Sequence, residues 1–192
     1  AASSQQIAWS AVGRSALALD PRWRGGDYYD AEPGDGPYAG LAIARAIAQI
    51  HYRSDESFQE RFGRALVEKD SLFGLWDRFQ VESYLDYHGE KLVRRFDANS
   101  YLVLNRAMDT HDLARGRISM EEAVKRISAT AATASISTDS LYPPHQQSEI
   151  QRLIHGTGGA CTYVEIDDSN GHDGFLLAAE GVGDVLRALL QS

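Results

Sequence analysis

Two stretches near the end of this chain predict a parallel sheet: AATASI at 131–136, followed by TDSLYP at 138–143, and CTYVEI at 161–166, followed by NGHDGFL at 170–176. The segment between them, 145–155, has the pattern of a helix. A strand–helix–strand crossover brings the ends of both strands to the same edge of a parallel sheet. The sequence therefore predicts that Asp139 and His172 meet at the edge where α/β sheets place their chemistry.

An aspartate and a histidine that meet in this way are two members of a nucleophilic triad. The imidazole takes a proton from a serine or cysteine, and the carboxylate orients the ring and stabilises its charged form. In α/β hydrolases the order along the chain is nucleophile, acid, histidine, and the 33-residue spacing leaves room for one helix and one strand. No G-x-S-x-G nucleophile elbow occurs in the chain. From the pattern alone a second interpretation stays open, in which Asp139 caps a helix and Gly171–Asp173 is a polar turn.

The composition narrows the class of protein. Lys and Arg total 19 against 27 Asp and Glu, and a formal net charge of −8 argues against a nucleic-acid partner held by general electrostatics. No apolar run is long enough to span a membrane, and without a signal-like segment we expect a cytoplasmic protein. Cys161 is the single cysteine, and no histidine pair has zinc-ligand spacing, so we expect neither a disulfide framework nor a metal site.

Three segments emerge along the chain. Within residues 1–37 the sequence predicts a helix at 5–19. A Gly- and Pro-rich connection follows it and begins at Asp20-Pro21. Residues 38–128 predict a helical lid, with apolar residues at steps of three or four. These residues are Leu41, Ala44, Ile47, Ala48 and Tyr52, then Val81, Tyr84, Leu85, His88, Leu92 and Phe96, then Tyr101, Leu104, Ala107 and Met108. Residues 129–192 alternate strand and helix, and because a parallel sheet needs more than two strands, we expect its partners upstream of Ala1.

Several further motifs are similar to the homoserine O-acetyltransferase family. They follow one another over nearly the whole chain: DPRWRGGDYY at 20–29, GLAIAR at 40–45, YRS at 52–54, RFGR at 61–64, FQVESYL at 79–85, RFDANSY at 95–101 and HDLARG at 111–116. The resemblance implies the C-terminal part of an α/β-hydrolase fold, with the last two core strands and a helical lid. The family's first strands and its nucleophile elbow have no counterpart in these residues.

The resemblance implies a two-step acyl transfer. A serine takes an acetyl group from acetyl-CoA as co-substrate, with no bound cofactor, and passes it to the hydroxyl of L-homoserine in methionine biosynthesis. His172 is then the general base and acid, and Asp139 orients it. Arg45 matches the arginine that grips the substrate carboxylate with its bidentate fork, and Tyr52, two helical turns on, matches a second substrate contact. Asp173 matches the carboxylate that meets the substrate amine.

Alternatives remain within and beyond this class. His51 replaces a small hydroxyl residue of the family, which leaves the acceptor preference open, and the donor could be succinyl-CoA or the acceptor serine. The chain could also be an inactive fragment, or one piece of a nicked or split enzyme that acts with its missing N-terminal portion. A non-catalytic helical interaction module is a third interpretation. The resemblance further implies a homodimer formed through the lid helices.

Overall fold

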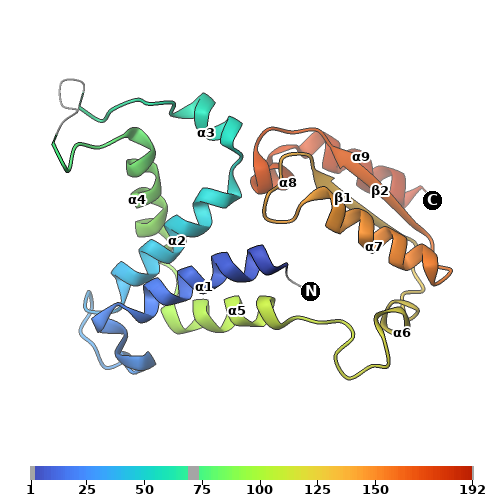
Figure 1. Cartoon of the computed structure of the whole chain (residues 1–192), viewed down its shortest axis with the longest axis horizontal. Coiled ribbons are helices and arrows are strands. Elements are labelled where there is room, and N and C mark those ends of the chain that lie inside the picture. Colours follow the sequence, from blue (N-terminus) through green and yellow to red (C-terminus); the bar gives the residue numbers. More distant parts are fainter. Residues whose placement is uncertain (1–2, 69–73, 192) are drawn as a thin grey trace. The chain divides into compact units, whose positions relative to one another are not determined.

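The computed structural model describes residues 3–68 and 74–191 and divides the chain into two compact units (Figure 1). Unit 1 comprises Ala1–Ile50 and Phe58–His111, and unit 2 comprises His51–Ser57 and Asp112–Ser192. The predicted segments 1–37 and 129–192 begin and end on residues outside the described ranges. The boundaries of these two units differ from those of the three predicted segments, 1–37, 38–128 and 129–192. The division into three segments therefore stays a prediction.

Unit 1 is helical, as the apolar spacing predicts. Its elements are α1 (Ser4–Ala18), the 3₁₀ turn η1 (Pro21–Gly26), α2 (Tyr38–Tyr52), α3 (Asp55–Arg61), α4 (Gln80–Val93) and α5 (Ala98–Thr110), with the end of α2 and the start of α3 counted in unit 2. Ser3 caps α1 by accepting a hydrogen bond from the Gln6 N–H, at 3.1 Å. The apolar spacing that begins at Val81 predicts a helix as far as Phe96, but α4 ends at Val93 because Asp97 already caps α5.

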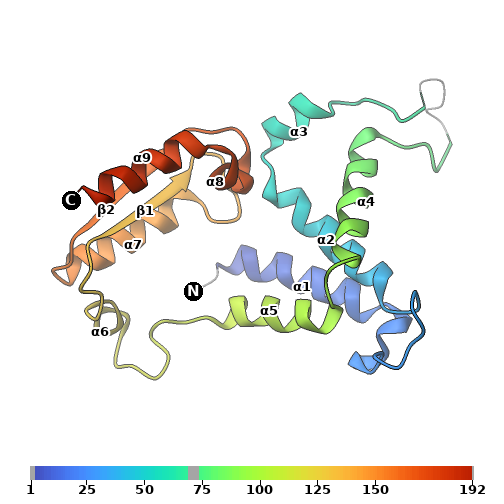
Figure 2. The same cartoon turned by 180° about the vertical axis from the view of Figure 1, so that it is seen from behind.

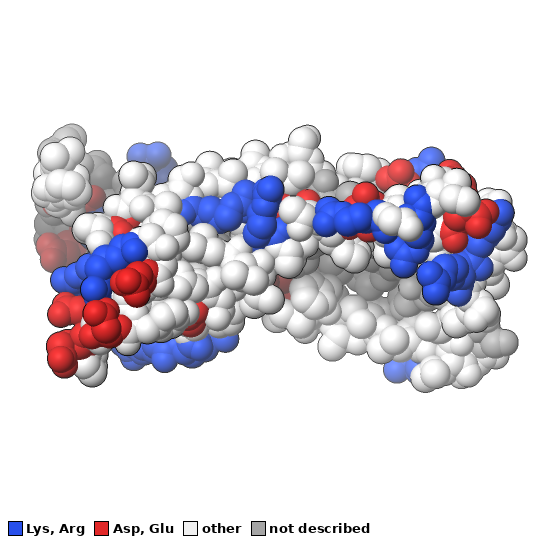
Figure 3. Space-filling model, turned by 90° about the horizontal axis from the view of Figure 1, so that it is seen from below, with Lys and Arg blue, Asp and Glu red and all other residues white. Residues whose placement is uncertain are grey.

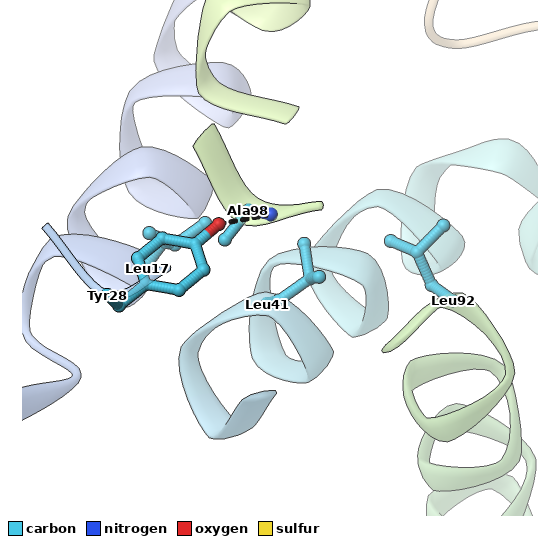
Figure 4. Close-up of a cluster of buried hydrophobic side chains, with 5 residues drawn as sticks. All are labelled: Leu17, Tyr28, Leu41, Leu92 and Ala98. Atoms are coloured by element: carbon cyan, nitrogen blue, oxygen red, sulfur yellow. Dashed lines mark hydrogen bonds between the residues drawn. The ribbon is translucent and has the colours of Figure 1, made fainter. Parts of the chain in front are cut away.

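The core of unit 1 forms where α1, α2, the end of α4 and the start of α5 come together, with Tyr28 from the connection after α1. Leu17 and Leu41 are fully buried, and Tyr28, Leu92 and Ala98 complete the cluster (Figure 4). α1 and α5 lie side by side in both views of the chain (Figures 1 and 2). A Cβ on Gly40 would lie 2.8 Å from the Leu17 Cα, so only glycine permits this close crossing of α1 and α2.

Tyr28 ties the connection after α1 to the start of α5. Its hydroxyl donates to Asp97 and accepts from the backbone N–H groups of Ala98 and Asn99, at 3.1 and 3.2 Å. Burial and the hydrogen bond to Asp97 raise the pKa of Tyr28 to about 12. The first turn of a helix has N–H groups without helical partners, and here a tyrosine satisfies two of them.

We expect Tyr28→Phe to lower the free energy of unfolding by about 1–2 kcal/mol, because two N–H groups and a carboxylate lose their partner. Urea denaturation followed by circular dichroism measures the change. Tyr29→Phe is the matched control: Tyr29 also donates to Asp97, at 3.3 Å, but its side chain is exposed, and its loss should cost under about 0.5 kcal/mol. Equal effects of the two substitutions would contradict the role of Tyr28.

Unit 2 contains a parallel pair of strands with helices on both faces. β1 (Ala131–Ile136) pairs with β2 (Cys161–Ile166), Ala131 opposite Cys161 and Ile136 opposite Ile166. α7 (Pro144–Gly156) connects the strands on one side of the sheet, and α9 (Ala179–Leu190) lies on the other (Figures 1 and 2). The predicted strand–helix–strand crossover is confirmed. The remaining elements are α6 (Met120–Val124), capped by Ser119, the 3₁₀ turn η2 (Gly171–Asp173) and α8 (Gly174–Leu177).

The small core of unit 2 lies under the α7 face of the sheet. It consists of Val124 from α6, Ile154 from α7 and Cys161 at the start of β2, all almost fully buried. Cys161 is thus a core residue, as its place in an apolar strand predicts. The short helix α6 packs against α7 and so belongs to this unit.

The surface carries charges of both signs. Basic side chains lie next to acidic ones at several places on the face shown in Figure 3. Exposed pairs such as Arg94–Glu90 and Arg187–Asp184 contribute little to stability because water screens them. None of the described helices combines the length and apolar composition needed to cross a lipid bilayer.

Candidate active site

Asp139 and His172 lie in contact at the carboxyl end of the strand pair. Asp139 Oδ2 is 2.9 Å from His172 Nδ1. The other carboxylate oxygen, Oδ1, accepts hydrogen bonds from the backbone N–H groups of Leu141 and Tyr142, at 2.8 and 2.9 Å. The tight turn after β1 therefore clamps the carboxylate on one side and leaves the other side for the imidazole.

The surroundings of Asp139 favour its charged form. The side chain is only 8% exposed, and burial alone would raise its pKa. The hydrogen bonds from His172, Tyr142 and Leu141 stabilise the carboxylate, and together they hold the pKa of Asp139 below its ordinary value. A charged aspartate on Nδ1 selects the tautomer in which Nε2 is the basic nitrogen, as general base catalysis requires.

This shift gives unit 2 a defined acid sensitivity. Because the pKa of Asp139 is lower in the folded protein than in the unfolded chain, its contribution to stability is present above about pH 4 and is lost as the pH falls further. We expect wild type to be more stable than Asp139→Asn near neutrality and this difference to shrink below about pH 4. Urea midpoints measured between about pH 3 and 7 test it, with exposed Asp184→Asn as control. A difference that stays constant over this range would contradict the shift.

Three aromatic rings surround the imidazole of His172. The ring centroids of Tyr52, Tyr142 and Phe175 lie 5.4, 5.3 and 5.1 Å from that of His172. His172 and Asp139 also line a cavity of about 300 Å³. Its other walls come from both strands and the flanking helices: Ala134, Ser135, Ile136, Tyr142, Gln147, Ile166, Phe175 and Val182. The dyad thus lies at the edge of a mostly apolar pocket.

The turn that carries His172 is held close to neighbouring chain segments. Gly171 has φ +68°, and a Cβ there would lie 2.5 Å from the Ser54 N and 2.7 Å from the Arg53 carbonyl carbon. On the β1 side, the Thr138 hydroxyl accepts from the Gly171 N–H at 3.0 Å and donates to the Asp168 carbonyl at 2.6 Å. Glycine is required here by both its conformation and the lack of space.

The structure brings four of the five predicted site residues into unit 2. Tyr52, the last residue of α2, packs against the imidazole of His172, and Asp173 follows His172 in η2. Asp173 Oδ2 forms an ion pair with Arg53 Nε, at 3.1 Å. Arg45 belongs to unit 1, seven residues earlier on the same helix, and is partly buried there. The roles of Arg45, Tyr52 and Asp173 toward a substrate stay predictions.

The sequence interpretation missed several residues around the dyad. Arg53, Thr138, Asn170 and Phe175 all contact the turn or the imidazole. Arg53 could have been suspected from its place in the YRS motif beside Tyr52, but its partners lie more than a hundred residues away. Among the described residues, no three His, Cys, Asp or Glu side chains come together as a metal site would require.

Comparison with known sequences shows relatives along nearly the whole chain. The chain is 49% identical to a homoserine O-acetyltransferase of Thermobifida fusca over 191 residues, 99% of the chain and 49% of that protein. It is 45% identical to a homoserine O-acetyltransferase of Moorella thermoacetica, over 97% of the chain and 49% of that protein. The chain spans about half the length of the curated relatives it matches. No model of a known protein family matches it.

Solved structures share the fold. A homoserine O-acetyltransferase from Bacillus anthracis superposes with a TM-score of 0.79 at 23% identity, covering 94% of this chain and 48% of that one. Esterase E22 superposes with a TM-score of 0.83 at 19% identity, covering 97% of this chain and 50% of that one. At such identities the likeness identifies the fold alone. The predicted fold class, part of an α/β-hydrolase fold with two core strands and a helical region, is confirmed.

Proposed function

We propose that this chain, which is homologous to the homoserine O-acetyltransferases over nearly its whole length, is the C-terminal part of such an enzyme. The proposed enzyme moves an acetyl group from acetyl-CoA to L-homoserine. The observation that carries the proposal is the buried Asp139 on the Nδ1 atom of His172, beside an apolar pocket. This pair is what acyl transfer through a serine requires. The relatives' name gives homoserine as the acceptor and acetyl as the group, and acetyl-CoA is the donor that we propose.

His172 moves one proton in each half of the proposed reaction. A serine oxygen attacks the thioester carbonyl while its proton passes to His172 Nε2; the C–S bond breaks, and the proton goes to the departing CoA thiolate. The homoserine hydroxyl then attacks the acyl-serine, again giving its proton to His172. The bond to serine breaks, serine takes the proton back, and O-acetylhomoserine leaves, a precursor for methionine synthesis. Asp139 stays ionised throughout and stabilises the transient imidazolium.

Three further residues are proposed to select an amino-acid acceptor. The Arg45 guanidinium binds the substrate carboxylate as a bidentate pair, and the Tyr52 hydroxyl adds a hydrogen bond to the bound substrate. Asp173 accepts from the substrate ammonium group. Its pairing with Arg53 is compatible with this role because a carboxylate has two oxygens and can accept from two donors at once.

The proposed nucleophile lies outside these 192 residues, since they contain no G-x-S-x-G elbow. The acid and the histidine follow the nucleophile in this fold, so the chain corresponds to the later part of the enzyme. We propose that the helices within residues 38–128 form the lid and a homodimer interface. The chain by itself is then one part of an active site and is expected to turn over no acetyl-CoA.

A chimera tests the function directly. The segment of the Thermobifida fusca relative that matches this chain is replaced by these 192 residues, and the purified protein is given acetyl-CoA and L-homoserine. Release of one CoA thiol per O-acetylhomoserine formed supports the proposal. A chimera that has the circular dichroism and melting of the relative yet forms no ester would refute it.

The same chimera separates the alternatives. Turnover that is faster with succinyl-CoA than with acetyl-CoA would identify succinyl-CoA as the donor. Turnover that is faster with L-serine than with L-homoserine would identify serine as the acceptor. Thiol release that does not need an acceptor would make the protein a hydrolase, the activity named for some proteins of the same fold. The 192-residue chain without the added part serves as the control, for which no turnover is expected.

A further inference from the structure

The segment that follows Tyr52 is bound to the turn that carries His172, although the two lie more than a hundred residues apart in sequence. The Ser54 hydroxyl donates to the Ser169 carbonyl and accepts from the Ser57 N–H, at 3.0 Å for the latter. The backbone at Arg53 and Ser54 is so close to Gly171 that no Cβ fits between them. These contacts place the Arg53 side chain alongside the turn.

The Arg53 guanidinium spans His172. Nη1 donates to the Asn170 side-chain oxygen at 3.2 Å, and Nε lies 3.1 Å from Asp173 Oδ2. One partner precedes His172 by two residues and the other follows it directly. A planar guanidinium fixes two partners at once in a way that a flexible ammonium cannot. The turn is therefore braced across the residue whose ring must stay on Asp139.

The environment makes this brace stronger than a surface ion pair. The side chains of Arg53 and Asp173 are only 19% and 20% exposed. Another arginine–carboxylate pair of unit 2, Arg187–Asp184, is 64% and 68% exposed. A shielded ion pair is less weakened by water and salt than an exposed one, so it holds its geometry better.

A second anchor acts on the opposite side of the turn. Thr138, the residue before Asp139, binds the Gly171 N–H and the Asp168 carbonyl. Thr138 thus ties the histidine turn to the strand that carries the acid, and Arg53 ties it to the end of α2. Without the Arg53 side chain the turn would keep the Thr138 anchor and the Ser54–Ser169 hydrogen bond, but Asn170 and Asp173 would lose the link that spans His172.

We propose that Arg53 is a positioning residue for this reaction: it bridges Asn170 and Asp173 to keep His172 Nδ1 on Asp139, and it aims the Asp173 carboxylate at the acceptor's ammonium group. The second part rests on the proposed function, whereas the first part concerns the geometry of the chain alone. Arg53 itself exchanges no proton with a substrate. Its effect is transmitted through His172 and Asp173.

The first test uses the 192-residue chain labelled uniformly with ¹³C and ¹⁵N. The Nδ1 proton of His172 is followed by NMR, and the carboxyl carbon of Asp139 is titrated with acid. In Arg53→Gln we expect the Nδ1 proton to exchange with water about tenfold faster or more, because the shielded ion pair with Asp173 and the hydrogen bond to Asn170 no longer hold the turn closed. The Asp139 pKa should rise toward its ordinary value as the His172 contact loosens.

Two further variants test whether the faster proton exchange and the shifted Asp139 titration come from the loss of the Arg53 contacts. Arg53→Lys keeps the charge but reaches one partner instead of two, so its exchange rate should lie between those of wild type and Arg53→Gln. Arg187→Gln removes an exposed arginine paired to an aspartate in the same unit and should leave both signals unchanged. If Arg53→Gln leaves the proton and the titration as in wild type, the positioning role is refuted. Equal loosening of the amides around Val124, Ile154 and Cys161 would also refute it, since Arg53 would then support the unit as a whole.

The second test uses the chimera and varies homoserine. We expect Arg53→Gln to lower kcat through His172 and to raise the KM for homoserine through Asp173, while the KM for acetyl-CoA stays within about twofold. Equal kinetics of Arg53→Gln and wild type would refute the role of Arg53 toward the acceptor. A wild-type chimera that transfers no acetyl group would instead refute the proposed function and leave the NMR result for Arg53 and His172 as it stands.

Discussion

Replacement of His172 by alanine is expected to lower the kcat of the chimeric enzyme by about 10⁴-fold or more. Without the imidazole, no group accepts the proton of the attacking hydroxyl or returns it to the leaving group. Asp139 would keep its two backbone hydrogen bonds, so the turn after β1 should stay intact. Binding of acetyl-CoA should change little.

Acetyl-CoA turnover with saturating homoserine measures the loss. His155→Ala is the matched control, because it removes an exposed histidine of the same unit, at the end of α7, and kcat should stay within about twofold. Asp139→Asn should lower kcat by a comparable factor, since the amide favours the wrong imidazole tautomer. The double variant should be little worse than either single one because the two residues act as a unit. A loss of under about tenfold in His172→Ala would contradict the catalytic assignment.

Replacement of Gly171 by alanine is expected to lower the free energy of unfolding of unit 2 by about 2–5 kcal/mol. Two costs add up. The backbone at φ +68° is in the left-handed region, which disfavours a residue with a Cβ, and the added methyl would lie 2.5 Å from the Ser54 N. Because that atom belongs to the backbone, rotation of a side chain cannot relieve the contact. The turn must move, and His172 moves with it.

Gly116→Ala is the control that carries only the first cost, the left-handed backbone. Gly116 has a similar φ of +73°, but no atom lies within 4 Å of the position that its Cβ would take, so its replacement should cost only about 1–2 kcal/mol. Chemical denaturation of both variants gives the difference, which measures the close approach of the 53–54 segment to the histidine turn. If the two substitutions cost the same, the two segments are not packed as closely as the structure has them.

The regular elements could be predicted because their signals are local. The apolar steps of three and four around Leu41 and Tyr84 define helices, and the short apolar runs at 131–136 and 161–166 define strands. The predicted end of α4 was wrong for an equally local reason. Phe96 continues the apolar spacing, but Asp97 caps the next helix and stops the one before it.

The meeting of Asp139 and His172 followed from a rule of topology. A right-handed crossover between adjacent parallel strands leaves few places for the residues that follow each strand. That the two residues share one edge of the sheet follows from the two strands and the helix between them, and the structure shows the direct contact at 2.9 Å. The spacing alone left open whether the pair is catalytic or a cap and a polar turn, and the family resemblance favoured the catalytic interpretation.

What the sequence determined by itself is thus the order and type of the elements, the shared edge that unites the acid with the histidine, and the family that the motifs resemble. Only the tertiary structure decided what holds the dyad in place: the Arg53 bridge from Asn170 to Asp173, the tight approach of Gly171 to Ser54, and the aromatic rings around His172. The physical reason is the separation along the sequence over which each interaction acts. Periodicity and capping act within a few residues, whereas Arg53 and Asn170 are 117 residues apart and meet only because the packed chain brings them together.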